Sequence, residues 1–287
     1  MKLIILLISA GFWSLHCSGQ TDSLGTDKTD SVAKKSTLTL GATYSNNADY
    51  YGQKAVEAIP YLAVSATYRF RSGFYLSGLV YRLLKDSVNT ISAENLRGGF
   101  QFNISKKLSA DISYNHTFYP AYSPLLQASN PDNVSAGLTY ENFLSSTLTA
   151  DYAFGKTTDF FVTAGTGKQI NLGHITQKDI ITLTPTFTVT AGTQRFYQTY
   201  LIEKKLQDSL LGIILPPLTG PQTSEISQTV TTTQFSVLSY NLNIPLAYSR
   251  AGYMIEINYQ LSQLSNKAES GPGQLNSFFS ASFYYQF

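Results

Sequence analysis

From residue 36 to the end of the chain, apolar and polar residues alternate with a period of two, and helical periodicity is nearly absent. In a β-strand, successive side chains point to opposite faces, so such a segment has one apolar face and one polar face. The segment YLAVSATYRF shows the pattern clearly, because Leu62, Val64 and Tyr68 oppose Ser65 and Thr67. The alternation predicts an all-β protein.

The pattern predicts about twelve strands, each close to the 9–11 residues that a tilted membrane strand needs. Strands of soluble sandwiches are usually shorter. Pro185 and Pro245 fall inside two of the segments, and we expect each at a bulge or near a strand end because proline lacks the ladder donor. The strands are expected at 36–44, 61–70, 73–84, 96–104, 108–118, 133–141, 146–154, 159–167, 180–194, 238–249, 253–262 and 278–287.

Short and long connections mostly alternate along the chain. Short ones are expected near residues 71, 105, 141 and 249, and long ones at 45–56, 85–90, 117–131, 194–230 and 262–275. Two connections break the rule: 155–158 is short and 167–179 is long. Alternation of this kind is typical of membrane barrels with short periplasmic turns and long outer loops. It predicts that both termini lie on the periplasmic side.

Composition decides which face is outside. Charged residues are 13 % of the chain, about half the usual share, and aromatic residues are also 13 %. The net charge of +2 is too small to indicate nucleic-acid binding. The apolar face carries mostly small and medium residues with aromatics near strand ends, as expected for contact with lipid and its interfaces. We therefore predict a transmembrane antiparallel β-barrel over residues 36–287, with outer-membrane lipid as its surroundings.

The N-terminus has the layout of a secretory signal peptide: one basic residue, Lys2, an apolar run too short to span a bilayer, and then small residues. Cleavage after Gly19 fits the small-x-small rule, and lipidation at Cys17 is the alternative. We expect a signal peptide at 1–19 and a polar, flexible periplasmic leader at 20–35. Cleavage after Gly19 removes the only cysteine, which leaves no disulfide chemistry.

The chain ends on FFSASFYYQF, in which Phe283, Tyr285 and Phe287 occupy alternate positions. This ending resembles the last strand of Gram-negative outer-membrane β-barrel proteins, which finish on Phe with aromatic residues two and four positions earlier. The resemblance implies that the barrel-assembly machinery recognises these three residues. The segment NIPLAYS and the Gln20 start further resemble barrels of Bacteroidota, and all these features imply the cell outer membrane.

Charged residues of both signs are expected on the polar, inward face. They can line a water-filled path and set its ion selectivity, or they can pair as structural ion pairs across a small lumen. Thr182, Thr184, Thr186, Thr188 and Thr190 share one face and predict a neutral, hydroxyl-rich wall. The charged candidates are Arg69, Arg97, Asp111, Glu141, Asp151 and Glu256, with Arg82 less clearly placed.

The longest connection contains the apolar run LLGIILPPL at 210–218. Exposed apolar stretches usually mark contact surfaces. This loop is therefore expected to fold inward as a constriction, to cap the mouth of the barrel, or to bind a partner protein at the surface or in the periplasm. The residues proposed for this role are Leu210, Leu211, Ile213, Ile214 and Leu215.

No constellation of residues indicates an enzyme, a metal site or a cofactor. Two histidines, His116 and His174, remain after the signal peptide, too few for a convincing metal site. His116 points towards lipid near the outer rim, as in outer-membrane phospholipases, but Phe118 stands where that family has its serine. We predict a narrow passive channel for small polar solutes. The alternative is a non-conducting scaffold or surface-partner protein in an envelope complex.

Overall fold

The computed structural model describes residues 35–54, 58–86, 90–120, 130–155, 158–193, 235–265 and 273–287. The predicted signal peptide and nearly all of the leader lie outside these ranges. Within them, every regular element is a β-strand. No helix in the described ranges is long and apolar enough to cross a membrane.

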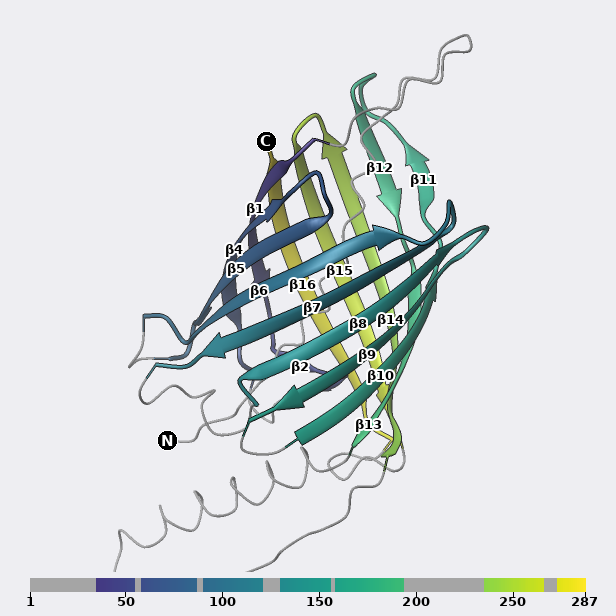
Figure 1. Ribbon diagram of the computed structural model, residues 1–287. Coiled ribbons are helices and arrows are strands. Elements are labelled where there is room, and N and C mark those ends of the chain that lie inside the picture. Colours follow the sequence, from purple (N-terminus) through teal and green to yellow (C-terminus); the bar gives the residue numbers. More distant parts are fainter. Residues whose placement is uncertain are drawn as a thin grey trace, which may run out of the picture.

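The described strands form a closed antiparallel barrel (Figure 1). Its first half comprises β1 (Thr37–Ser45), β4 (Tyr61–Arg69), β5 (Phe74–Leu83), β6 (Ala93–Asn103), β7 (Leu108–Phe118), β8 (Asp132–Glu141) and β9 (Ser145–Phe154). The second half comprises β10 (Thr158–Gly167), β11 (Ile170–Gly173), β12 (Asp179–Leu183), β13 (Thr186–Thr193), β14 (Phe235–Arg250), β15 (Tyr253–Leu264) and β16 (Leu275–Gln286). Two short strands, β2 (Asp49–Tyr50) and β3 (Gln53–Lys54), pair with each other and are not part of the wall.

Four of these segments combine into two long strands. Gly167 pairs with Thr186 and Ile170 pairs with Leu183, so β10 and β11 continue one register against β13 and β12. Likewise, β12 and β13 pair with β14 in one continuous register, from Leu183 with Leu246 to Thr186 with Asn243. The barrel therefore has twelve strands, which confirms the predicted fold class.

The barrel closes between its first and last strands. β1 pairs with β16 along its length, from Thr39 with Gln286 to Ser45 with Ser280, and the N–H of Phe287 donates to the carbonyl of Leu38 at 2.9 Å. Figure 1 shows β1, in purple, beside β16, in yellow. The start of β1 and the end of β16 therefore lie at the same end of the barrel.

The outer surface of the wall is apolar, as the composition of the two faces predicted. Large apolar and aromatic side chains at every second position of each strand are exposed, including Val64, Leu96, Ile112 and Leu148. Their neighbours in sequence point inward and are mostly Ser, Thr, Gly and Asn. In water such an exposed apolar surface would be costly, but in lipid it is the expected outer face of a barrel.

The prediction for the two prolines holds for one of them. Pro185 lies in the break between β12 and β13. Pro245 lies in the interior of β14, paired in regular register with Asn258, so the prediction was wrong there. On the other side of Pro245, the N–H of Thr184 donates to its carbonyl at 3.0 Å, and the reciprocal bond cannot form because proline has no N–H. The ladder tolerates Pro245 because one partner strand is itself interrupted beside it.

The long connection expected at 167–179 is largely strand. β11 and β12 form a hairpin that carries the barrel strands further, so the turn shrinks to residues 174–178. Figure 1 shows this β11–β12 hairpin extending past the neighbouring strands at the end where the C-terminus lies. β11 is the last strand of the sheet order, so its second edge has no partner strand among the described residues.

Because one face of each strand contacts lipid and the other faces the lumen, a charge should have different effects on the two faces. Leu148 points outward near the middle of β9 and is 49 % exposed, so Leu148→Arg is expected to lower the free energy of unfolding by about 2–4 kcal/mol. The inward neighbour Thr149 is the matched control, and Thr149→Arg should cost much less because the arginine enters a polar lumen. Denaturant unfolding in lipid vesicles measures both, and equal losses would contradict the assigned facing.

Candidate functional site

The connection between β1 and β4 folds into the barrel instead of lying over its mouth. Its short strands β2 and β3 form a hairpin whose two turn residues, Tyr51 and Gly52, both have positive φ, +46° and +92°. This is the geometry of a type I′ turn, the tight turn best suited to a two-residue hairpin. We call this hairpin, Asp49–Lys54, the lumen hairpin.

Polar contacts hold the lumen hairpin against the part of the wall formed by β15 and β16. Asp49 accepts hydrogen bonds from the N–H of Gly52 at 2.7 Å and from Nε2 of Gln260 at 2.7 Å. Nδ2 of Asn276 donates to the carbonyl of Gly52 at 2.9 Å. At the base of the connection, Oδ1 of Asn47 accepts from the N–H groups of Ala48 and Ile59, both at 2.9 Å. These bonds satisfy backbone groups that the lumen would otherwise leave unpaired.

Asp49 is the charged residue of this contact. Burial raises the pKa of Asp49 to about 6, although the hydrogen bonds from Gln260 and Gly52 act in the opposite direction. Both hydrogen-bond donors are neutral, so neither compensates the negative charge that the carboxylate carries above that pH.

The turn of the lumen hairpin fits closely against β14. A Cβ added to Gly52 would lie 2.8 Å from Oδ1 of Asn241 and 2.9 Å from Cβ of Ser239. Real Cβ atoms do not approach other atoms so closely, and the φ of +92° is itself unfavourable for any other residue. Glycine at this position is therefore required both by the turn and by the space.

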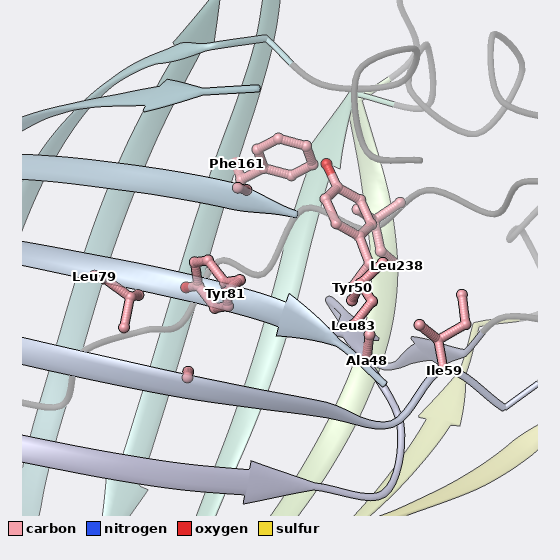
Figure 2. Packing of buried hydrophobic residues seen from close by; sticks show 10 residues of the cluster. Ala48, Tyr50, Ile59, Leu79, Tyr81, Leu83, Phe161 and Leu238 are labelled. Carbon is pink, nitrogen blue, oxygen red and sulfur yellow. The ribbon is translucent and has the colours of Figure 1, made fainter. Parts of the chain in front are cut away.

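An apolar cluster inside the barrel connects the β1–β4 connection with two parts of the wall (Figure 2). Tyr51 stacks on Phe161 of β10 with ring centroids 4.3 Å apart, and Tyr50 meets the same ring edge-on at 6.3 Å. Phe161 is 1 % exposed and Leu238 of β14 is fully buried. The members are Ala48, Tyr50 and Ile59 from the connection, Ala63, Leu79, Tyr81, Leu83 and Ala93 from β4–β6, and Phe161 and Leu238. The connection thus crosses the lumen near the end of the barrel that carries the long loops, and it narrows the lumen there.

The predicted lumen residues all occupy inward positions of their strands. Arg69 and Arg97 lie on one section of wall, at 5.0 Å and 5.8 Å from the ring centre of Tyr75. Nη1 of Arg69 donates to Gln101 at 2.6 Å. Nη2 of Arg97 lies 3.5 Å from Oδ1 of Asp111, which also accepts from Oη of Tyr75 at 3.0 Å. The structure brings these two arginines and Asp111 together as a partly paired group.

The remaining predicted carboxylates lie apart from that group. Asp151 accepts from Oγ of Ser135 at 2.5 Å and from Nδ2 of Asn133 at 3.4 Å. Glu141 accepts from Oγ of Ser145 at 2.9 Å at the short-turn mouth. Glu256 points inward from β15, between Ala247 and Ser282. Within the described strands, inward carboxylates outnumber inward guanidinium groups.

The threonine row lines the lumen beside the lumen hairpin. Thr182, Thr186, Thr188 and Thr190 are all buried on the inward face of β12 and β13. Oγ1 of Thr190 lies 3.2 Å from Oγ1 of Thr163 on β10, and Nδ2 of Asn241 donates to Thr188 at 3.4 Å. The wall is thus neutral and rich in hydroxyl groups, as predicted.

Two residues on the outer face bear on the sequence predictions. Arg82 pairs across the ladder with the outward Leu62 and is exposed, so its suggested lumen position was wrong. His116 faces outward, as predicted, and its Nδ1 lies 2.7 Å from Oδ1 of Asp132, an outward residue of β8 that also accepts from Oη of Tyr114 at 2.5 Å. Asp132 lies at the first position of its strand.

Sequence reasoning missed the lumen hairpin. The predicted constriction or partner loop, with Leu210, Leu211, Ile213, Ile214 and Leu215, lies outside the described residues and stays a prediction. Two signals could have pointed to the hairpin: the segment DYYGQK, in which glycine follows a tyrosine pair, and the doublet Phe160–Phe161, in which one ring must point inward. Among the described residues, no group of three or more His, Cys, Asp or Glu could hold a metal ion.

No protein-family model matches this chain, and no curated protein sequence matches it. Solved structures match in fold. The KdgM porin aligns over 87 % of this chain and 99 % of its own, with 9 % identity and a TM-score of 0.48. The NanC porin aligns over 86 % and 98 %, with 7 % identity and a TM-score of 0.44. An outer membrane channel from Pseudomonas putida F1 aligns over 92 % and 100 %, with 10 % identity and a TM-score of 0.44. The similarity to each concerns the barrel fold alone.

The close fit of Gly52 gives a direct test of the lumen hairpin. Gly52→Val is expected to displace the hairpin from β14, and the amides of residues 46–54 should then exchange hydrogen at least tenfold faster. Gly173→Val is the matched control, because Gly173 also has positive φ, +112°, but open space around it. Hydrogen-exchange mass spectrometry in neutral detergent measures both. Unchanged exchange at 46–54 in Gly52→Val would contradict the docked hairpin.

Proposed function

We propose that this chain is an outer-membrane channel that passes small polar solutes passively, and that the lumen hairpin sets its narrowest point. The observation that supports the proposal most directly is the combination of a polar, hydroxyl-rich inner wall with a chain segment tethered across it. A twelve-stranded barrel lies between those filled by their own side chains and the wide porins. A segment of this size inside it leaves room for small solutes only.

The charges of the lumen favour cations over anions. Arg69 and Arg97 are engaged on one section of wall with Asp111 and Gln101. Asp151 and Glu141 accept hydrogen bonds from neutral groups only in the described structure, and Glu256 faces the neutral Ala247 and Ser282. Rings of carboxylates favour cations in aqueous pores. We therefore infer a preference for small cationic or neutral polar solutes.

The same proposal includes an assembly signal and an orientation for the barrel. The outward-facing aromatic residues Phe283 and Tyr285 of β16, followed by Phe287, are the assembly signal in this proposal. The short-turn end then faces the periplasm, with both termini there. The outward residues His116 and Asp132 then lie near the opposite rim of the barrel. In this proposal the chain is a channel and not an enzyme.

The channel proposal predicts the effect of removing its constriction. The chain from Gln20 should give stable openings in a planar bilayer, and replacing residues 47–58 by a short Gly–Ser linker should increase single-channel conductance at least twofold. Gly52→Val should increase it in the same direction, and Gly173→Val should not. If neither the wild type nor the linker variant conducts, the channel proposal fails.

The charge asymmetry predicts the ion selectivity. In a KCl gradient, the reversal potential should indicate that K⁺ permeates several times more readily than Cl⁻. The double variant Asp151→Asn, Glu256→Gln should reduce that ratio, because it removes inward carboxylates. Asp132→Asn removes an outward carboxylate and is expected to leave the ratio unchanged. A preference for Cl⁻ in the wild type would contradict the assignment.

A second candidate function is a scaffold or partner-binding barrel. The observation that favours it is the projecting β11–β12 hairpin, in which Leu172 is 53 % exposed and Ile175 is 73 % exposed. Apolar side chains exposed on a projecting element are typical of a contact surface. Two results together would favour this function. The first is that the chain gives no channel openings in a planar bilayer. The second is that an envelope protein co-purifies with the wild type and with the matched variant Thr176→Asn, but not with Ile175→Asp.

A further inference from the structure

Where the lumen hairpin meets β14, β15 and β16, hydrogen-bond acceptors outnumber donors. Oδ1 of Asn241 and Oδ1 of Asn276 are buried and have no hydrogen-bond partner. Both side chains are more than nine-tenths buried, at 6 % and 1 % exposure. A buried polar atom without a partner lowers the stability of the fold, so two in one contact call for an explanation.

The amide donors nearby make other hydrogen bonds, and none of them donates to these oxygens. Nε2 of Gln260 donates to Asp49 at 2.7 Å and to Oγ of Ser262 at 2.9 Å. Nδ2 of Asn276 donates to the carbonyl of Gly52 at 2.9 Å, and the N–H of Gly52 donates to Asp49 at 2.7 Å. Nδ2 of Asn241 donates to Thr188 and Ser239.

The side chains of Asn241, Asn276 and Asp49 all contact one point, the turn at Gly52. Oδ1 of Asn241 is 2.8 Å from the position that a Cβ of Gly52 would take. Asn276 contacts the carbonyl of Gly52, and Asp49 contacts its N–H. Asn241 and Asn276 both flank Ser262 in the strand register, so their side chains leave the wall in one row.

We propose that a calcium ion binds between the lumen hairpin and the wall, with the carboxylate of Asp49 and the side-chain oxygens of Asn241 and Asn276 as its protein ligands. Calcium takes six to eight oxygen ligands from carboxylates, amide carbonyls and water in flexible geometry. Magnesium requires near-ideal octahedral geometry and gives up its water reluctantly, so this mixed set suits it less well. The ion satisfies both amide oxygens and compensates the charge of Asp49.

The single carboxylate sets the expected affinity. Sites with few charged ligands bind calcium with Kd values of about 10⁻⁴–10⁻³ M. Because the ligands come from the hairpin and from the wall, calcium binds the docked hairpin only. The site does not depend on conduction, so it can be tested whether or not the barrel forms a channel.

The test measures hydrogen exchange of residues 46–54 in the refolded chain, without lipopolysaccharide and in neutral detergent. At 10 mM CaCl₂ the exchange should slow about tenfold relative to NaCl of equal ionic strength, as mass action predicts for a Kd of about 10⁻³ M. At 10 mM MgCl₂ it should change less than twofold. Equal exchange in all three salts, or equal slowing by calcium and magnesium, would overturn the proposal.

Two variants separate the site from a general effect of calcium on the barrel. Asp49→Asn should abolish the slowing by calcium, and the matched variant Asp151→Asn, an inward carboxylate on another part of the wall, should keep it. Asn241→Asp adds a second carboxylate, and the hydroxyl groups of Thr188 and Ser239 can turn to donate to it. This variant should reach the same slowing at least tenfold lower calcium, a gain that misfolding cannot produce. No gain would count against the site.

Discussion

The structure depends on one constraint: in lipid, every backbone N–H and C=O of the wall needs a partner within the protein. A sheet meets that constraint only when it closes, and here closure is the pairing of Thr37–Ser45 with the C-terminal strand. Alternation then follows, because each strand touches lipid on one face and the lumen on the other. The aromatic ladder at the C-terminus is the outward face of the closing strand. Even Pro245, which lacks a ladder donor, is placed where the neighbouring strand is interrupted.

The lumen obeys a different rule from the outer surface, because water can enter it. Polar groups inside are tolerated when they find partners, and the β1–β4 connection uses that freedom. It combines an apolar contact, Tyr51 on Phe161, with polar contacts at Asp49 and Asn276. The apolar contact holds the segment across the lumen, and the polar contacts fix its orientation. One segment therefore combines an apolar contact and polar contacts inside the lumen.

The sequence determined much of the fold and little of the site. Strand number and facing follow from a period of two, which segments such as 61–70 show without ambiguity, and the structure confirms them. Placement inside the lumen does not follow from periodicity, because an inserted connection looks like any polar loop. Asp49 acquires its role from Gln260, a partner 211 residues away in the sequence. The length of the connection at 167–179 was overestimated for a related reason. The strand residues of the projecting hairpin, including Asn171 and Gly173, are too polar or too small to show alternation.

The lumen hairpin also has a consequence for how the barrel reaches its final form. Its partners Asn241, Gln260 and Asn276 come from the three strands made last, so it cannot dock before the wall is complete. A slip of β16 by one residue would turn Asn276 towards lipid and bring Phe279 to the inward face, because side chains alternate strictly along a strand. The hairpin would then lose its contact at Gly52. Docking thus takes place only in a barrel that has closed in the correct register, and it distinguishes a correctly assembled wall from one that has merely closed.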